Sequence, residues 1–496
     1  MTNICLPQRI NLAIMAFFGF TCEYMMRNLL SIAITQIVQK QYDTSQSIMG
    51  EVCPADNETL SNDIDNELGG RGTYDWSEAV QGVILSSFYW GYIITHIPGG
   101  ILVEKLGGKI TFLFGIAATS ILTFLTPASI TYGGSTFLII NRVIMGLSQG
   151  FIYAAVFGLL AAWIPLRERT TLGVFVLSGM QLGSILSTYL SGVLLKHIDS
   201  WAWSFYIYSI IGLIWCVAFM FFCSKDPESN KFITEEEKNY LRKEIGILER
   251  DTNLPPTPFK AIITSLPVWA VIISQTGMDF SFYVMTTDLP KYFSDVMRLD
   301  VEKNGLYSSL PQVLNFFTAM GFGLVSDYCI NKKLLSVRNT RRFFTTTGTF
   351  GLAICFIMAS YSGCDRLQAM IFFSLASGFA GLDNSRINSM DLSPNYTPTI
   401  TAIVNTCGSI MGILAPMAVG LLTPNSTILE WRVVFWLAFG ILISTGIFYF
   451  ISADGKVQPW NDPNTRRNYT NGVENGYAQK SDSSNHELKD NFIKNF

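Results

Sequence analysis

Charged residues are scarce in this sequence of 496 residues. Asp, Glu, Lys and Arg together make up 14% of the chain, whereas 49% is hydrophobic and the mean hydropathy is +0.32. A soluble protein of this size carries roughly 25% charged residues. The scarcity argues against a soluble protein and indicates one whose solvent is the lipid bilayer.

The sequence also lacks an excess of one charge and any metal-binding pattern. Its 34 Lys and Arg nearly balance 37 Asp and Glu, so no basic field favours nucleic acid. Nine cysteines occur without a CxxC spacing, and the three histidines, His96, His197 and His486, lie in unrelated segments. Because no Ser-His-Asp arrangement or phosphate-binding loop is present either, we expect no metal, no cofactor and no enzyme activity.

Long hydrophobic runs, in contrast, are abundant. A helix of about 20 apolar residues crosses the hydrocarbon core of a bilayer. The first run, from Ile10 to Val38, lacks a small-residue cleavage site, so it reads as a membrane helix and not as a signal peptide. The expected spans are 10–38, 79–101, 110–128, 136–160, 171–194, 204–223, 266–288, 305–325, 343–361, 368–388, 400–421 and 432–451.

Polar segments divide these twelve spans into two sets of six. Residues 1–223 form an N-terminal half and residues 261–452 a C-terminal half, joined by a charged linker at 224–260. The linker pattern predicts an amphipathic helix followed by a proline-rich stretch, and the polar tail at 453–496 reads as disordered. We therefore expect an all-α membrane protein with twelve transmembrane helices in two six-helix halves.

The distribution of lysine and arginine assigns the two sides of the membrane. About 23 of these residues lie on the side that holds both termini and the linker, against about eight on the other side. The termini and linker are therefore expected in the cytosol, and the loop at 39–78 outside. That loop contains a glycosylation sequon at Asn57, and Asn425 begins a second sequon in the last outer loop.

Two cysteines, Cys53 and Cys364, fall in expected outer loops, where oxidation is possible. Because the sequence does not place these loops relative to each other, no disulfide between them is predicted.

A short motif recurs at equivalent places in the two halves. GILVEKLGGK contains Gly100, Glu104 and Lys105, and GLVSDYCINKK contains Gly323 and Asp327. In each copy a glycine and an acid stand four residues apart at the cytosolic end of a helix, before basic residues. Such clusters can join helix ends in one conformation and release them in another; the alternative is an ordinary charged loop.

GILVEKLGGK resembles the loop signature of the major facilitator superfamily. Further stretches resemble its anion-transporting branch: sialin, the vesicular glutamate transporters and the type I sodium-phosphate cotransporters, which form solute carrier family 17. They are FYWGYIITHIPGG, NRVIMGLSQG, WIPLRER, SGMQLGS, WSFYIYSIIG, LYSSLP, MDLSPNY and GKVQPW, in family order. The resemblance implies the major facilitator fold and secondary active transport of small organic anions or phosphate by alternating access.

Two arginines, Arg27 and Arg142, lie within expected spans. A charge inside the membrane is costly and is by default a functional candidate. Both match arginines that bind the anion in the family, and Tyr92, Tyr153 and Tyr283 match tyrosines that line its substrate cavity. Arginine suits this task because it stays charged and offers a planar fork to a carboxylate or phosphate. The alternative is that these residues serve only packing.

The sequence departs from the family at Gln149, where sialin-like and glutamate-carrying relatives have a glutamate that binds a proton. A glutamine cannot titrate, so the usual proton coupling is not expected, and the residue resembles the sodium-phosphate branch instead. Met278 and Leu85 replace an arginine and a histidine of the glutamate carriers. These replacements argue against vesicular glutamate transport.

Further charged residues in the spans are particular to this chain. Glu23 lies four residues before Arg27 on the same helix face, so it either pairs with the arginine or, when protonated, releases it as a substitute coupling acid. Asp279 poses the same question. Asp383 and Arg386 are three residues apart and are expected to pair with each other, so they are left out of the substrate site.

Other functions fit the same residues. Sodium- or voltage-driven transport of phosphate or urate-like anions would leave Gln149 neutral, and an anion channel or a transport-inactive sensor is the alternative from another class. The coupling ion is expected to be H⁺ or Na⁺, and the partners a small anionic substrate and the lipid bilayer. Because neither terminal segment contains an acidic dileucine, the plasma membrane is favoured over a lysosomal or vesicular membrane.

Overall fold

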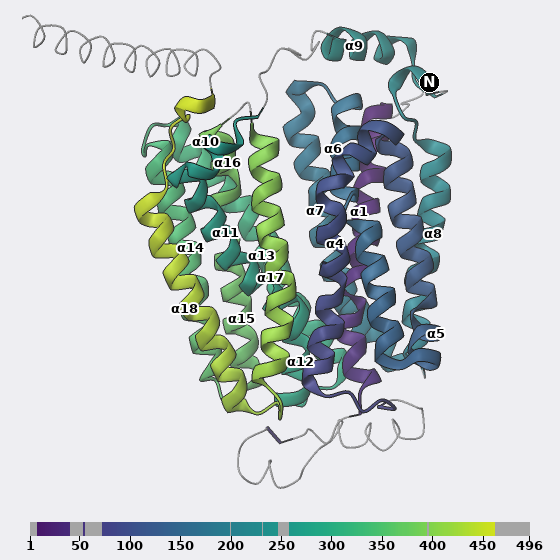
Figure 1. Cartoon of the computed structure of the whole chain (residues 1–496), viewed down its shortest axis with the longest axis vertical. Coiled ribbons are helices and arrows are strands. Elements are labelled where there is room, and N and C mark those ends of the chain that lie inside the picture. Colours follow the sequence, from purple (N-terminus) through teal and green to yellow (C-terminus); the bar gives the residue numbers. More distant parts are fainter. Residues whose placement is uncertain are drawn as a thin grey trace, which may run out of the picture.

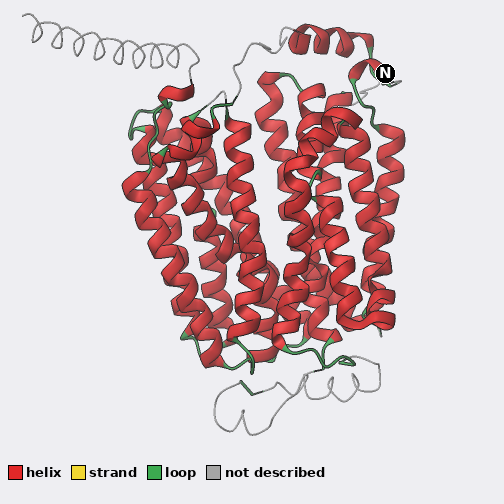
Figure 2. Cartoon of the chain, viewed as in Figure 1, coloured by secondary structure: helices red, strands yellow, loops and turns green. Residues whose placement is uncertain are grey.

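The computed structural model describes residues 7–39, 53–54, 72–198, 200–230, 232–246, 257–393 and 396–461. These residues are almost entirely helical (Figure 2), and one isolated bridge pairs Val38 with Tyr74. The helices form two groups that stand side by side (Figure 1). The N-terminal residues and helix α9 lie at one end of the molecule, here called the linker end, and α12 lies at the opposite, outer end.

The N-terminal group contains the first six spans. Its helices are α1 (Gln8–Ile37), α4 (Glu78–Leu106), α5 (Gly108–Gln149), α6 (Ile152–Trp163), α7 (Leu166–His197) and α8 (Ala202–Phe222). The label α5 covers the third span and most of the fourth. The two spans are separated by a break at Gly134, whose φ of 57° is not helical.

The C-terminal group contains the remaining six spans. It comprises α10 (Phe259–Thr264), α11 (Leu266–Tyr283), η2 (Val284–Asp288), α12 (Leu289–Lys291), η3 (Tyr292–Val296), α13 (Val301–Asn331), α14 (Val337–Ser360), α15 (Arg366–Ala380), α16 (Ser385–Leu392), α17 (Thr397–Leu422) and α18 (Ile428–Ser452). The seventh span runs from α11 through the wide π turns of η2 and η3. The tenth span is divided between α15 and α16. The twelve-helix architecture expected from the sequence is confirmed.

Seven helical segments among the described residues are long and apolar enough, by length and composition alone, to cross a membrane. One of them, Gly108–Leu160, is 53 residues long and holds two spans. Other spans carry charges or are interrupted. Helix α1 contains Glu23 and Arg27, and the tenth span is broken after Ala380.

The expected amphipathic linker helix is α9 (Glu235–Gly246). It is bound to the N-terminal group. The carboxylate of Glu237 accepts hydrogen bonds from the backbone N–H groups of Gln8 and Arg9, at 2.8 and 3.2 Å, which satisfies donors at the start of α1. The Arg9 side chain forms ion pairs with Glu237 and with Glu168 of α7.

The first part of the tail, residues 453–461, is ordered, although the sequence predicted disorder from residue 453 onwards. The backbone N–H of Gln458 donates to the carbonyl oxygen of Leu392 at 2.9 Å, and the ring of Trp460 lies 6.3 Å from that of Tyr396. The segment 453–461 is therefore held against the end of α16 by a backbone hydrogen bond and an aromatic contact. Residues 462–496 lie outside the described part of the chain.

The two groups approach each other most closely near the outer end, where α4 crosses α17 and α7 crosses α13. A Cβ built on Gly305 of α13 would lie 2.8 Å from the Cα of Gly192 of α7. A Cβ on Gly82 of α4 would lie 2.5 Å from the carbonyl oxygen of Pro416. Glycine is needed at these crossings because a side chain would force the helices apart.

Ion pairs also join the groups at the outer end. Lys291 of α12, only 2% exposed, binds Glu78 at the start of α4. Lys196 at the end of α7 binds Glu302 at 2.7 Å and Asp300 at 3.4 Å, next to the start of α13. The structure therefore represents a conformation closed at the outer end.

Cys53 and Cys364 form a disulfide, with their Cα atoms 5.4 Å apart and a sequence separation of 311. This bond was not predicted. It forms because the segment around Cys53, from the N-terminal half, lies on the C-terminal group: the Cys53 N–H donates to Val296 and the Arg366 guanidinium donates to the carbonyl of Pro54.

The repeated loop motif lies at the linker end, in the last turns of α4 and within α13. Lys105 is exposed there. The side chains of Glu104 and Asp327 and the surroundings of Gly100 lie outside what the structure describes. The gating role expected of these residues and of Lys105 therefore stays a prediction.

The two expected glycosylation sites differ in what the structure describes. Asn57 lies outside the described residues. Asn425 is exposed, and its side-chain amide donates to Glu430 at 2.9 Å.

Candidate substrate site

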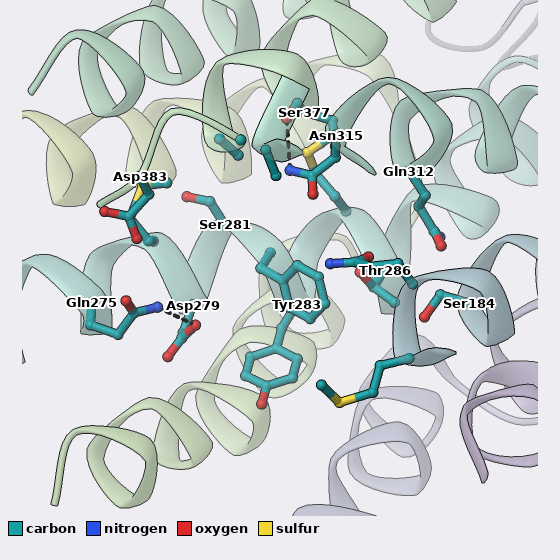
Figure 3. Close-up of a pocket in the computed structure, with 18 of the residues that line it drawn as sticks. Ser184, Gln275, Asp279, Ser281, Tyr283, Thr286, Gln312, Asn315, Ser377 and Asp383 are labelled. Atoms are coloured by element: carbon teal, nitrogen blue, oxygen red, sulfur yellow. Dashed lines mark hydrogen bonds between the residues drawn. The ribbon is translucent and has the colours of Figure 1, made fainter. Parts of the chain in front are cut away.

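A cavity of about 390 Å³ lies between the two groups of helices. Its wall from the N-terminal half includes Arg27 of α1, Tyr92 of α4 and Tyr153 of α6. Its wall from the C-terminal half includes Asp279 and Tyr283 of α11. Part of this cavity is drawn in Figure 3, where Tyr283 stands on the same helix as Asp279. The cavity is thus lined by charged and aromatic side chains from both halves.

Arg27 is held by aromatic rings. Its guanidinium carbon lies 4.5 Å from the ring centre of Phe88, 5.0 Å from those of Tyr89 and Tyr92, and 5.2 Å from that of Tyr24. Rings at these distances attract the cation through their negative faces. Among the described residues, no carboxylate lies within ion-pair distance of this guanidinium and none accepts a hydrogen bond from it. Its planar fork therefore faces the cavity without an anionic partner.

Glu23 does not pair with Arg27, contrary to one of the two expectations. The Glu23 side chain is buried, and its Oε2 atom has no hydrogen-bond partner among the described residues. It does not line the cavity. The spacing of four residues allows the pair, but the guanidinium instead lies against aromatic rings of α4. Its role as a coupling acid stays a prediction.

Arg142 lies directly behind Arg27. Both of its terminal nitrogens donate to the backbone carbonyl oxygen of Arg27, at 3.3 and 3.4 Å, and its guanidinium carbon lies 5.2 Å from the Phe88 ring. Its side chain is buried and does not line the cavity in this conformation. The structure brings the two expected arginines together, but only Arg27 is exposed to the cavity.

The three expected tyrosines, Tyr92, Tyr153 and Tyr283, all line the cavity. Two further tyrosines of the site were not singled out from the sequence. Tyr24 lines the cavity one helical turn before Arg27, a spacing that the sequence displays. Tyr89 packs edge to face on Tyr283 with ring centres 4.8 Å apart, and so joins the two halves beside the cavity.

Arg386 pairs with Asp279 and not with Asp383 as expected. Its Nη2 atom lies 2.9 Å from Oδ1 of Asp279, which also accepts a hydrogen bond of 2.8 Å from Gln275 (Figure 3). Asp383 instead accepts two hydrogen bonds from Ser385, from its backbone N–H and its hydroxyl. Arg386, Asp279 and Asp383 all line the cavity.

A break in the tenth span explains this difference. Asp383 precedes α16, in the turn after α15, whereas Arg386 lies in the first turn of α16. The rule that residues three apart share a face holds only within one continuous helix. Because the helix is broken between them, the Arg386 side chain reaches across to α11.

Two polar side chains near the site lack partners. Gln149 is fully buried, both of its amide atoms lack a hydrogen-bond partner among the described residues, and it does not line the cavity. His96 lines the cavity, and its Nδ1 atom has no hydrogen-bond partner there. His96 was not predicted as a site residue, because a single histidine without a partner in the sequence carries no pattern.

Comparison with known proteins agrees with this architecture. The family model of the Major Facilitator Superfamily matches residues 16–416. A Drosophila melanogaster protein named "Putative inorganic phosphate cotransporter" is 35% identical over 466 residues, which cover 92% of this chain and 87% of that protein. Human sialin is 33% identical over 459 residues, which cover 92% of this chain and 91% of sialin.

The fold has solved counterparts. The crystal structure of a D-xylose-proton symporter superimposes with a TM-score of 0.65 at 13% identity, covering 90% of this chain and 98% of the symporter. At this identity the likeness concerns the fold alone. The family match and the relatives indicate the function more closely than the fold does. The chain belongs to the Major Facilitator Superfamily of membrane transporters, in the family that includes sialin and the phosphate cotransporter named above, and is not an enzyme.

Proposed function

We propose that this protein is a secondary active transporter of small anions, organic carboxylates or phosphate, which works by alternating access. The observation that carries the proposal is the guanidinium of Arg27, which faces the cavity among aromatic rings and without an anionic partner. The relatives support the class of substrate, because one is named a phosphate cotransporter and another is sialin.

The surroundings of Arg27 favour an anion over water. A buried charge is costly unless it is paired and hydrogen-bonded, and the rings compensate for only part of the lost hydration. A carboxylate or phosphate bound to the planar fork forms charge-assisted hydrogen bonds, which are among the strongest in proteins. The hydroxyl groups of Tyr92, Tyr153 and Tyr283 provide further donors in the same cavity.

Arg142 completes the anion site by positioning Arg27. Its two hydrogen bonds to the Arg27 carbonyl hold α1 and α5 together at the level of the site. The same guanidinium becomes a second direct contact if the carbonyl is released when the halves rearrange. Substitution of Arg142 is therefore expected to weaken anion binding, as is substitution of Arg27.

Transport in this scheme alternates between two closures. The outer end is closed by the Lys291–Glu78 pair and by the α7–α13 crossing, and opening these contacts would expose the same cavity to the other side.

Gln149 binds no proton. We propose Glu23 and Asp279 as the candidate coupling acids for H⁺, with Na⁺ as the alternative coupling ion.

The proposal is tested by uptake of radiolabelled lactate and phosphate into liposomes that contain the purified protein. Arg27→Gln removes the contact, and a hydrogen bond to a charged group contributes about 1.5–3 kcal/mol, so half-saturating concentrations should rise by roughly 10- to 150-fold. Arg27→Lys keeps the charge but loses the fork, so it should cost a large part of the same amount.

Arg338→Gln provides the matched control, because Arg338 is about half exposed at the linker end and its ion pair with Asp454 is long, at 3.9 Å. Its uptake should equal that of the wild type. Unchanged affinity in Arg27→Gln would refute the site. Flux that never saturates would indicate a channel, and binding without flux would indicate a sensor.

We also propose the plasma membrane as the location of the protein. Surface biotinylation of cells that express a tagged chain should recover most of it. Recovery confined to lysosomes or vesicles would contradict this assignment.

A further inference from the structure

We propose that Arg386 is a second anion contact, supplied by the C-terminal half, and that Asp279 is the counterion it exchanges for substrate. The inference rests on the proposed anion transport and identifies anions with two negative groups as the preferred cargo. One group would bind Arg27 of the N-terminal half, and the other would bind Arg386.

The Arg386 side chain is available to a ligand. It is 53% exposed although it lies within the tenth span, and it lines the cavity. Its pair with Asp279 uses one nitrogen, Nη2, at 2.9 Å. Among the described residues, the other donors of the guanidinium make no hydrogen bond. The guanidinium of Arg386 therefore has donors that are free to bind a ligand while Nη2 remains paired with Asp279.

Arg386 and Arg27 face the same space from opposite halves. Arg27 lines the cavity from the N-terminal half, and Arg386 lines it from the C-terminal half. Tyr153 and Tyr283 line the same cavity, one from each half. A substrate with a negative group at each end would place one group at each arginine.

Asp279 is held in place without Arg386. Its Oδ1 atom accepts a hydrogen bond of 2.8 Å from Gln275, which lies one turn earlier on α11. Its Oδ2 atom packs against Gly408 of α17, where a built Cβ would lie 1.9 Å from that oxygen. Asp279 therefore stays on the wall, whereas the half-exposed Arg386 has room to turn towards a ligand.

The exchange replaces one carboxylate partner of Arg386 by another. A fully buried ion pair is costly to break because one charge is left unpaired, but here the incoming anionic group pairs with the arginine at once. The carboxylate of Asp279 keeps Gln275 as a donor. An anion with one negative group binds Arg27 and leaves the Asp279–Arg386 pair intact, so it gains nothing from the C-terminal half.

The test compares succinate, which has two carboxylates, with lactate, which has one, in the liposome assay. In Arg386→Gln, the half-saturating concentration of succinate should rise by on the order of 10-fold or more, and that of lactate by less than about 2-fold. Asp279→Asn removes the competing counterion. It should tighten equilibrium binding of succinate severalfold, whatever its effect on uptake, whereas a purely structural ion pair predicts that this variant binds neither anion.

The double variant Asp279→Asn with Arg386→Gln separates the two roles. If the pair is structural, removing both partners should restore succinate affinity; if Arg386 binds substrate, the double variant should behave like Arg386→Gln. Monodisperse elution of each purified variant serves as the folding control. Equal effects of Arg386→Gln on succinate and lactate, or no effect on either, would overturn the inference.

The proposed function can fail separately. Uptake of both anions by the wild type and its loss in Arg27→Gln would support the proposed function. If Arg386→Gln then keeps the wild-type affinity for succinate, only the role of Arg386 is overturned. A wild type that takes up neither anion would overturn the anion transport on which this inference depends.

Discussion

At the scale of single residues, buried polar side chains without partners lie near the site but outside its lining. Both amide atoms of Gln149 and the Oε2 atom of Glu23 are buried without a hydrogen-bond partner among the described residues. An unsatisfied buried polar group costs about 1–3 kcal/mol, so such groups are expected to serve function and not stability. Gln149 can satisfy its amide only by rearrangement or hydration, neither of which releases a proton.

Gln149→Glu should make transport depend on the proton gradient. A carboxyl group in this buried position is less costly when it is protonated than when it is charged, so its proton should accompany each cycle. An imposed inward proton gradient should therefore raise uptake by this variant more than it raises wild-type uptake. Gln149→Met, which has similar length and no titratable group, is the control.

The opposite result is equally informative. If wild-type uptake collapses when only the proton gradient is dissipated, another acid carries the proton. Glu23 and Asp279 would then be tested in that order by substitution with Gln and Asn.

At the scale of helices, close crossings decide which conformation the protein adopts. Gly192 of α7 and Gly305 of α13 allow backbone contact at the outer end, as small residues do at interfaces between membrane helices. Breaks in helices matter as much. The turn between α15 and α16 directs Arg386 towards α11, which neither hydrophobic periodicity nor span length predicts.

Gly305→Val should open the outer end. A side chain forced into a packed contact costs typically 1–3 kcal/mol, so the closed conformation should become less populated by roughly 5- to 150-fold. A cysteine introduced at Ser409, which lines the cavity, should then react faster with a membrane-impermeant maleimide added from outside.

Gly321→Val is the matched control in the same helix, because nothing lies within 4 Å of a Cβ built at that glycine. Its labelling rate should equal that of the parent protein. Equal labelling of Gly305→Val and Gly321→Val would show that the crossing does not hold the outer end closed.

At the scale of the whole molecule, contacts between the halves accumulate near one end. The Lys291–Glu78 pair, the ion pairs of Lys196 and the Cys53–Cys364 disulfide all join them there. In Figure 1 the two groups of helices converge towards α12 and lie further apart at the linker end. The outer end is therefore joined by ion pairs, which can open, and by a disulfide, which fixes the segment around Cys53 to the C-terminal group covalently.

Glu78→Gln should open the outer end through electrostatics. Lys291 is 2% exposed, and removal of one partner of a buried ion pair typically costs about 3–5 kcal/mol because the remaining charge is unpaired. Labelling of the cysteine at position 409 from outside should increase more than 10-fold, since every 1.4 kcal/mol corresponds to a factor of ten.

The double variant Glu78→Gln with Lys291→Met should label more slowly than Glu78→Gln alone, because it does not leave the charge of Lys291 buried without Glu78. If the single variant labels at the wild-type rate, the pair does not contribute to closure.

The sequence by itself determined the twelve spans, the two halves, the linker helix and the charged Arg27 within a span, whereas the tyrosines of the cavity were indicated by the family resemblance. These features are local: bilayer thickness sets the length of each apolar run, and a charge inside such a run is visible at once. Only the tertiary structure decided that Arg142 lies behind Arg27, that Arg386 pairs with Asp279, and that Cys53 reaches Cys364. Such partners depend on how each helix is rotated and where it breaks, and they belong to segments far apart in the chain, so no spacing in the sequence records them.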